Sequence, residues 1–88
     1  MHFRWNDWNR EKVSSHGLRI DQVEVVVESA RSPYPLQRED DKYLVWGADQ
    51  DGEFLQVVFL IDPDGAIFVI HGRRLTEREK KRYRRREK

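Results

Sequence analysis

Three apolar segments in the middle of the chain have the length and the bounding turns of β-strands. They are residues 42–47 (KYLVWG), 53–62 (EFLQVVFLID) and 66–71 (AIFVIH), and the second is the most apolar. The links between them, DQDG at 49–52 and DPDG at 62–65, contain the Asp, Pro and Gly residues that favour tight turns. The sequence therefore predicts a three-stranded antiparallel meander.

Two helices are predicted before this meander. Asn9 can cap a helix that ends at His16, and Gly17 suits the left-handed conformation that often follows a helix. A second helix is expected from Asp21, because Asp21 and Glu24 have the spacing of a capping box. Its apolar residues then fall on one side of the helix: Val23, Val26, Val27 and Ala30.

A third helix is predicted from about Thr76, where Thr76 and Glu79 have the spacing of a second capping box. Only Leu75 and Tyr83 supply large apolar side chains to it, so burial in the core cannot be the main force that holds this helix. Many of its basic residues are four positions apart, a spacing at which like charges repel each other on a helix. We therefore expect residues 84–88 to fray unless a polyanion neutralises them.

The remaining segments complete an α+β fold in one domain, residues 1–88. Residues 2–5 (HFRW) are a candidate short strand, and residues 31–40 (RSPYPLQRED) are predicted to be a loop because they contain two prolines. The expected order is two N-terminal helices, the three-stranded meander and a basic C-terminal helix. A chain of 88 residues buries only about 60% of its unfolded surface, so a homo- or hetero-oligomer is a reasonable expectation.

Charge is unevenly distributed along the chain. Charged residues make up 38% of it, yet the net charge is only +1. Residues 73–88 contain ten basic and three acidic side chains, a net charge of +7, so residues 1–72 carry −6. A basic end on an acidic body indicates that the C-terminal end binds a polyanion or an acidic protein.

Metal, cofactor and membrane functions find little support in the sequence. The chain has no cysteine, which excludes disulfides and thiolate metal sites. The histidines, His2, His16 and His71, have no carboxylate at metal-ligand spacing, so neither a metal nor a cofactor is predicted. The opening segment lacks the apolar stretch of a signal peptide, and the longest apolar run, residues 57–61, is too short to span a membrane. We expect a soluble, cytoplasmic protein without a membrane partner.

A group of polar residues near the C-terminus could cleave RNA without a metal. His71 ends a predicted strand, Arg73 and Arg74 follow it, and Tyr83 lies in the last helix. Such cleavage needs a base for the 2′-hydroxyl, cations that hold the phosphate, and an acid for the leaving oxygen. His suits the proton transfer and Arg the phosphate. Each residue also has a structural explanation: His71 could bond a loop, and Tyr83 could anchor its helix to the sheet.

The order of these features resembles the BrnT family of bacterial toxins, within the RelE-like ribonucleases. The resemblance covers nearly the whole chain, from the aromatic opening FRW through the His16-Gly17 helix end and the VEVVVE helix. Its most specific part is VIHGRRLTEREKKRY, which is similar to a strand, an arginine-containing exit and a helix with Thr, Glu-Arg and Tyr. His71-Gly72 departs from the Ser-Ala that is common in the family.

This resemblance implies a RelE-like fold and a metal-independent endoribonuclease toxin that slows translation. It also implies a small ribbon-helix-helix antitoxin as partner, with DNA bound only through the complex of the two proteins. The candidate catalytic residues are Arg73, Arg74, Tyr83 and His71. The candidate RNA phosphate-binding residues are Arg38, Lys42, Arg78, Lys81 and Arg82.

Two other classes of function fit the same residues. The basic C-terminal helix could make the chain a nucleic-acid-binding module without catalytic activity. It could also make the chain an interaction subunit that docks on an acidic protein and binds no nucleic acid. Cleavage of RNA by the purified protein distinguishes the toxin from both.

Overall fold

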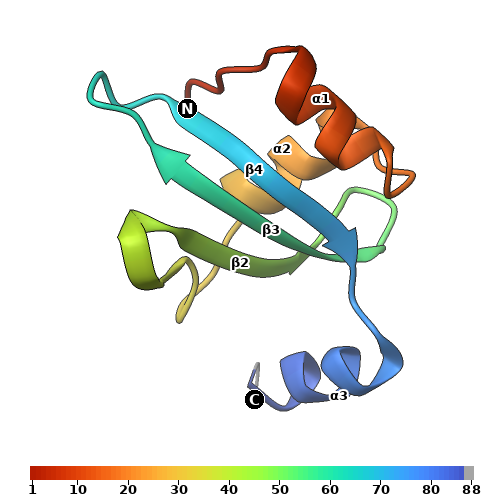
Figure 1. The fold of residues 1–88 in the computed structure, drawn as a ribbon. Coiled ribbons are helices and arrows are strands. Elements are labelled where there is room, and N and C mark those ends of the chain that lie inside the picture. The colour runs from red at the N-terminus through yellow and green to blue at the C-terminus, as the bar shows by residue number, and fades with distance from the viewer. Residues whose placement is uncertain (87–88) are drawn as a thin grey trace.

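A four-stranded antiparallel sheet forms the middle of the fold, with helices on both of its faces (Figure 1). The computed structural model describes residues 1–86. Their elements in chain order are α1 (Asp7–Ser14), α2 (Ile20–Glu28), β1 (Leu36–Gln37), the 3-10 turn η1 (Glu39–Asp41), β2 (Tyr43–Ala48), β3 (Phe54–Ile61), β4 (Ile67–Arg74) and α3 (Glu77–Arg86). The fold is thus of the mixed α+β class.

The sheet contains one strand more than the sequence predicts. Its strand order is β1-β2-β3-β4, and β1 lies in the segment 31–40 that was expected to be a loop. In β1, Leu36 pairs with Leu44 and Gln37 pairs with Tyr43. A two-residue strand that follows two prolines has no alternation to reveal it, so the prediction of three strands was wrong on this point.

The N-terminal segment is not a strand. In the predicted strand 2–5, Phe3 makes an isolated parallel bridge with Ile67 on the outer edge of β4. The backbone N–H of Arg4 also donates to the carbonyl of Ile67 at 2.9 Å. This segment is therefore attached to the sheet without extending it.

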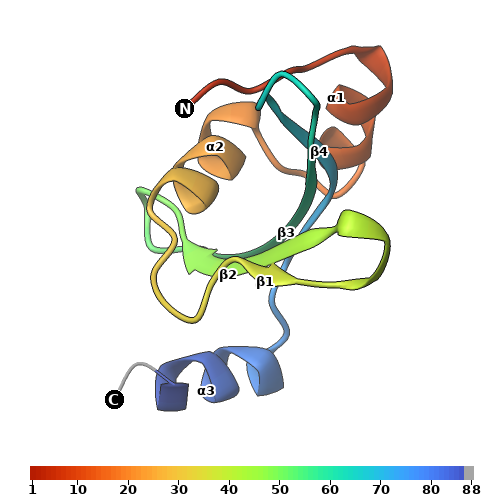
Figure 2. The same ribbon diagram turned by 90° about the vertical axis from the view of Figure 1, so that its left-hand side faces the viewer.

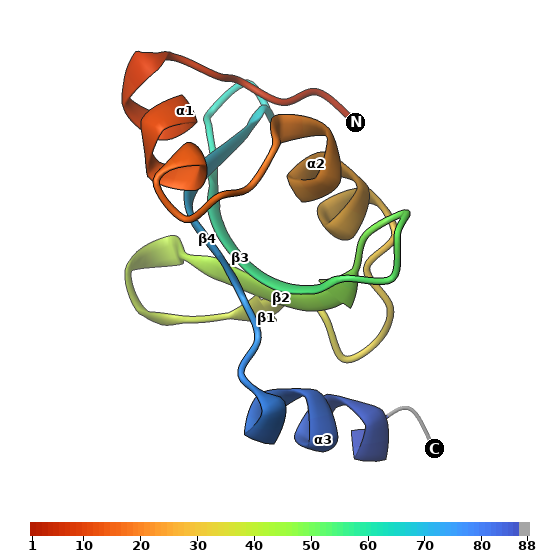
Figure 3. The ribbon, with the colours of Figure 1, turned by 90° about the vertical axis from the view of Figure 1, so that its right-hand side faces the viewer.

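The main core lies between the sheet and the two N-terminal helices. The sheet curves around α2, and α3 lies on the opposite side (Figures 2 and 3). Alternate residues of the strands face α1 and α2 because side chains of a strand point to opposite faces in turn. Fully buried core residues come from both layers: Val13, Val23, Val26, Val45, Leu55, Val57 and Val69. Burial of each such side chain contributes about 1.5–3 kcal/mol, so this layer provides most of the stability.

The first helix begins earlier than predicted. Its cap is Asn6, whose side chain accepts the N–H of Asn9 at 3.0 Å, while the Asn9 side chain accepts the N–H of Asn6 at 2.7 Å. Asn9 is fully buried and also donates to the carbonyl of Arg4, so it is the third helical residue and not the cap. The helix ends at Ser14 rather than His16, and Gly17 has the left-handed φ of 75° that the sequence suggests.

The second helix also starts one residue earlier, at Ile20. Its capping contact comes from Gln22, whose side chain accepts the N–H of Arg19 at 2.7 Å. Asp21 therefore lies inside the first turn, and Glu24 accepts the indole N–H of Trp5 instead of capping the helix. The predicted capping pair was wrong because the pair that forms, Arg19 and Gln22, lies two positions earlier in the sequence.

The third helix agrees more closely with the sequence. The Glu79 side chain accepts the N–H of Thr76 at 2.8 Å, and the Thr76 hydroxyl accepts the N–H of Glu79 at 3.2 Å, which confirms the capping box. Leu75 and Tyr83 are buried, as expected of the two apolar residues of this segment. Residues 84–86 of the segment expected to fray are helical here, and residues 87–88 lie outside the described part. Within residues 1–86, no helix has the length and apolar character that a membrane span requires.

Candidate functional site

A β-bulge determines which way the predicted site residues of β4 point. Val58 pairs with His71 and Phe59 pairs with Val69, so Ile70 is an extra residue between them. Such a residue reverses the alternation of the side chains that follow it. As a result Gly72 faces the core, where an added Cβ would come within 3.3 Å of Leu18 and Val13, and Arg73 faces the opposite side.

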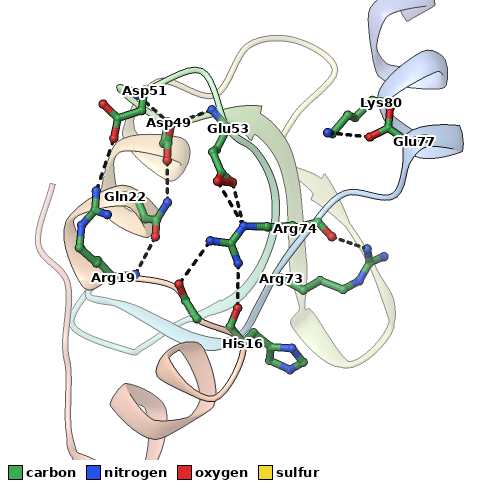
Figure 4. A network of polar contacts seen from close by, with 11 residues as sticks. His16, Arg19, Gln22, Asp49, Asp51, Glu53, Arg73, Arg74, Glu77 and Lys80 are labelled. Atoms are coloured by element: carbon green, nitrogen blue, oxygen red, sulfur yellow. Dashed lines mark hydrogen bonds and ion pairs between the residues drawn. The ribbon is translucent and has the colours of Figure 1, made fainter.

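Arg73 and Arg74 therefore do not converge, although they are neighbours in sequence. Figure 4 shows their side chains on opposite sides of β4. The guanidinium of Arg73 donates to both carboxylate oxygens of Glu79 at 2.8 Å, to the Gln56 side chain at 3.1 Å and to the Arg74 carbonyl at 3.1 Å. These four hydrogen bonds occupy both terminal nitrogens, and they tie α3 to the sheet.

The carboxylate of Glu79 remains ionised in this arrangement. Its hydrogen bond with Arg73 is the largest of the effects that lower its pKa from 4.5 to about 2, and the N–H of Thr76 adds to it. A charge-assisted, two-pronged pair of this kind is stronger and more directional than an ordinary surface ion pair. Arg73 is consequently a structural link at the base of α3.

Arg74 connects three separate parts of the chain. Its Nε donates to Glu53 at 2.8 Å, and its terminal nitrogens donate to the carbonyls of His16 at 3.1 Å and Gly17 at 3.4 Å (Figure 4). The carbonyls at the end of a helix lack partners within the helix, and here Arg74 supplies them. It fixes the loop that follows α1 against the end of β4.

A buried carboxylate holds the turn that positions Glu53. Asp49 accepts the backbone N–H groups of Asp51 at 2.8 Å and Glu53 at 2.9 Å, and the Gln22 amide at 2.6 Å. Burial alone would raise the pKa of Asp49, but these hydrogen bonds lower it below its ordinary value. The β2–β3 turn is thereby attached to α2, and Glu53 is held where its carboxylate accepts the hydrogen bond of Arg74 (Figure 4).

Two histidines from distant parts of the sequence meet at the edge of the sheet. The rings of His16 and His71 have centroids 5.5 Å apart and an angle of 72° between their planes. Burial is the largest cause that lowers the pKa of His71 below 6.5, and the charges of His16 and Arg73 lower it further. His71 is half-buried and its lowered pKa favours the unprotonated form at neutral pH, whereas His16 is exposed. His16 was not among the predicted site residues, because its pairing with His71 depends on the fold alone.

Tyr83 lies over the other face of the sheet and packs among aromatic rings. Its ring centroid is 5.7 Å from that of Phe54 and 6.0 Å from that of Tyr34. Tyr34 also stacks on Trp46, with a centroid distance of 6.4 Å. Tyr83 thus anchors α3 to the sheet. This is the structural role that the sequence allowed as an alternative to catalysis.

The predicted phosphate-binding residues occupy two neighbouring regions. Arg38 and Lys42 flank η1 and line an open hollow together with Glu39 and Asp40, so two acidic side chains oppose their charge there. Arg38 also lines a smaller hollow with Arg82 of α3, and so the structure brings these two arginines together. Arg78, Lys81 and Arg82 are all exposed on α3.

Arginines of α3 lie over the aromatic rings of the sheet. The guanidinium of Arg82 is 5.7 Å from the ring centroid of Trp46, and that of Arg84 is 5.3 Å from the ring centroid of Phe54. Trp46 and Phe54 were assigned only to strands by the sequence, because nothing in their spacing indicates that both face α3. We call Tyr34, Trp46, Phe54 and Tyr83 the aromatic cluster.

The candidate site thus consists of a histidine pair at the edge of β4 and a basic helix over the aromatic cluster. In the described part of the chain, no group of three or more His, Cys, Asp or Glu side chains could hold a metal ion. The chemistry available is proton transfer by imidazole and the binding of anions by arginine. Comparison of the chain with models of protein families, with curated proteins and with solved structures finds no match.

Proposed function

We propose that this chain is a metal-independent endoribonuclease toxin with a RelE-like fold, as its resemblance to the BrnT family implies. The observation that carries the proposal is the contact between His16 and His71, with ring centroids 5.5 Å apart. A half-buried, unprotonated imidazole beside an exposed one provides both a base and an acid. Cleavage of RNA by attack of its own 2′-hydroxyl requires these two groups and a way to bind the phosphate.

The proposed reaction divides the proton transfers between the two histidines. Unprotonated His71 takes the proton of the 2′-hydroxyl, and the 2′-oxygen forms a bond to phosphorus. The bond from phosphorus to the 5′-oxygen breaks, and His16, as the general acid, gives a proton to that oxygen. The products are a 2′,3′-cyclic phosphate and a free 5′-hydroxyl, and the exposed arginines and lysine of α3 bind neighbouring phosphates.

Arg73 and Arg74 act in this scheme as positioning residues, since their guanidinium groups are held by carboxylates. Arg74 binds the carbonyl of His16 and so fixes the main chain that carries the imidazole. The charge of Arg73 contributes to the low pKa of His71. Tyr83, a buried residue of α3, supports the RNA-binding surface instead of the proton transfers.

A cleavage assay in EDTA tests the proposal. End-labelled single-stranded RNA is incubated with the purified wild type, with His71→Ala, with His16→Ala and with His2→Ala as a matched control far from the pair. We expect cyclic-phosphate products from the wild type and from His2→Ala, and a loss of about 100-fold or more in each of the other two. Equal rates in all four proteins, or cleavage of RNA whose 2′-hydroxyls are methylated, would contradict the mechanism.

The proposal includes a small ribbon-helix-helix antitoxin in the cytoplasm, with DNA bound only by the complex. The basic surface of α3 would attract an acidic segment of such a protein. Expression of the chain alone in a bacterial host is expected to arrest growth, and expression with the antitoxin to restore it. Unimpaired growth with the chain alone, at a confirmed protein level, would contradict the toxin assignment.

A nucleic-acid-binding module without catalysis is the second candidate. It is favoured by the ion pairs of both arginines at the end of β4, which leave α3 as the main basic surface. Retention of RNA in a gel-shift assay, with no cleavage at any pH from 5 to 9, would select this function over the first.

A further inference from the structure

A hollow of about 300 Å³ lies between the end of α2, β2 and α3. Its aromatic wall consists of Trp46, Phe54 and Tyr83, and its polar wall includes Arg31 and Ser29. Three aromatic side chains, from β2, β3 and α3, therefore meet around one open space. The hollow is separate from the histidine pair, which does not line it.

Trp46 separates this hollow from the smaller one that Arg38 and Arg82 line. The second hollow has a volume of about 50 Å³ and shares Trp46 with the first. The cationic residues that border the two are thus Arg31 on one side and Arg38 and Arg82 on the other. Among the described residues that line either hollow, none is acidic.

The orientation of Trp46 is fixed before any ligand binds. Its indole N–H donates to the side-chain oxygen of Gln56 at 3.0 Å, and Arg73 donates to the same oxygen at 3.1 Å. Arg73 is in turn held by Glu79. Because these residues satisfy the polar atom of Trp46 and lock its ring, a planar ligand meets a preorganised platform and little side-chain entropy is lost on binding.

The geometry points to a binding site for one unstacked nucleobase of single-stranded RNA in this hollow. Aromatic rings flanked by arginines are the recurring means by which proteins bind single-stranded nucleic acid, since bases stack on the rings and phosphates pair with the cations. The volume is at the lower limit of small-ligand pockets, which suits one base with its ribose. The base stacks on the aromatic wall, while Arg31 and Arg82 bind the phosphates on its two sides.

This site deepens the proposed function and rests on it for the identity of the ligand. Trp46, Gln56 and Arg73 face one another across three adjacent strands. Two strand spacings, about 10 Å, therefore separate the backbone of Trp46 from β4, which carries His71. A base held in the hollow would fix the position of the RNA chain relative to the histidine pair and so select the bond that is cleaved.

Fluorescence of Trp46 tests the inference directly. In the variant Trp5→Phe/Trp8→Phe, Trp46 is the remaining tryptophan, and its emission is recorded during titration with a 2′-O-methyl RNA pentanucleotide that cannot be cleaved. We expect saturable quenching, and binding about 5- to 100-fold weaker when Phe54→Leu is added. The exposed change Ile61→Ala is the matched control and should leave the affinity unchanged, while circular dichroism verifies that each variant is folded.

The outcomes distinguish the inference from the proposed function. RNA that binds by gel shift but leaves the emission of Trp46 unchanged would overturn the inference, whether or not the histidine pair cleaves RNA. Quenching by the pentanucleotide without cleavage of ordinary RNA would uphold the hollow as an RNA site and overturn the endoribonuclease. Adenosine, cytidine, guanosine and uridine monophosphates are titrated in parallel, and equal affinity for any of them and for the pentanucleotide would assign the hollow to a free nucleotide instead.

Discussion

The guanidinium of Arg73 and the carboxylate of Glu79 form two parallel hydrogen bonds of 2.8 Å between β4 and the first turn of α3. The same carboxylate caps α3 by accepting the N–H of Thr76. One side chain therefore both starts the helix and holds it on the sheet. The apolar anchors of α3 are few, so this ion pair has more influence on the position of the helix than a surface pair ordinarily has.

We predict that Glu79→Gln lowers the free energy of unfolding by about 1–3 kcal/mol, because it weakens charge-assisted hydrogen bonds of a partly buried arginine. Urea titration followed by Trp46 emission in the Trp5→Phe/Trp8→Phe background measures the change. Glu77→Gln is the matched control, since Glu77 pairs with Lys80 on the exposed side of the same turn. An equal shift of the urea midpoint in both variants would show that Glu79 has no special role.

Acid should weaken the attachment of α3 in a defined range of pH. The pKa of Glu79 is lowered from 4.5 to about 2 in the folded protein, so the unfolded chain binds its proton more readily. The stabilisation from this group is complete above about pH 4.5 and is lost as the pH falls through about 2. Unfolding curves of the wild type between pH 5 and 2 should fall more steeply than those of Glu79→Gln. Parallel curves for the two proteins would contradict this assignment.

The pH dependence of RNA cleavage should follow His71. Because its pKa lies below 6.5, the imidazole is ready to accept a proton at neutral pH, and the acid limb of the rate profile should lie below that value. Arg73→Gln removes one of the charges that lower this pKa, and we expect the acid limb of the profile to move to higher pH. The pKa of His71, followed by NMR of its ring protons, should move in the same direction. An unchanged NMR titration in Arg73→Gln would exclude the electrostatic link.

We predict that Arg74 supports cleavage through the geometry of its hydrogen bonds as well as through its charge. Arg74→Lys keeps the charge but cannot reach Glu53 and the two carbonyls of His16 and Gly17 together, since lysine has one nitrogen in place of a planar fork. We expect kcat for cleavage to fall in Arg74→Lys, with KM nearly unchanged, because the position of His16 is altered and the RNA-binding helix is not. A rise in KM with constant kcat would instead identify Arg74 as a phosphate ligand.

Substitution by alanine should destabilise the protein for different reasons at Gly72, which lies in β4, and at Gly65, which lies in the turn before it. A Cβ at Gly72 would lie 3.2 Å from Leu18 and 3.3 Å from Val13, so Gly72→Ala overfills the core and should cost about 1–3 kcal/mol. A Cβ at Gly65 meets nothing within 4 Å, but its φ of 88° is unfavourable for alanine and should cost about 1–2 kcal/mol. Double substitution with Val13→Ala should relieve part of the first cost and none of the second, as measured by thermal unfolding.

The sequence predicted the parts of the fold that depend on local chemistry. The hairpin turns, the left-handed Gly17 and the capping box of α3 are confirmed, because each depends on residues a few positions apart. The start of α1 was displaced because Asn6 and Asn9 are both good caps and only packing chooses between them. The start of α2 was displaced because Gln22, and not Glu24, makes the capping contact. The strand β1 was missed because two residues carry no periodic signal.

The candidate site was predicted less well for a physical reason. Sequence proximity suggested that Arg73 and Arg74 act together, but a strand turns adjacent side chains to opposite faces. Their carboxylate partners, Glu79 and Glu53, were not expected from the sequence. His16 and the aromatic cluster likewise depend on contacts between residues far apart in the chain. Composition pointed to the C-terminal end of the chain, and the structure shows which carboxylate each of the two arginines contacts there.

The extra residue Ile70 divides β4 into two parts, and side chains alternate between the faces of the sheet in opposite order in the two parts. Regular alternation from Ile67 and Val69 would have turned the imidazole of His71 and the guanidinium of Arg73 toward the valines of the core, where neither could be solvated. The insertion of one residue lets a glycine take the crowded inner position and keeps both polar groups outside. Removal of Ile70 would leave every later side chain of β4 on its present face of the sheet. Removal of Gly72 would instead move the side chains that follow it to the opposite face, so the bulge at Ile70 determines which side chains of β4 face the core.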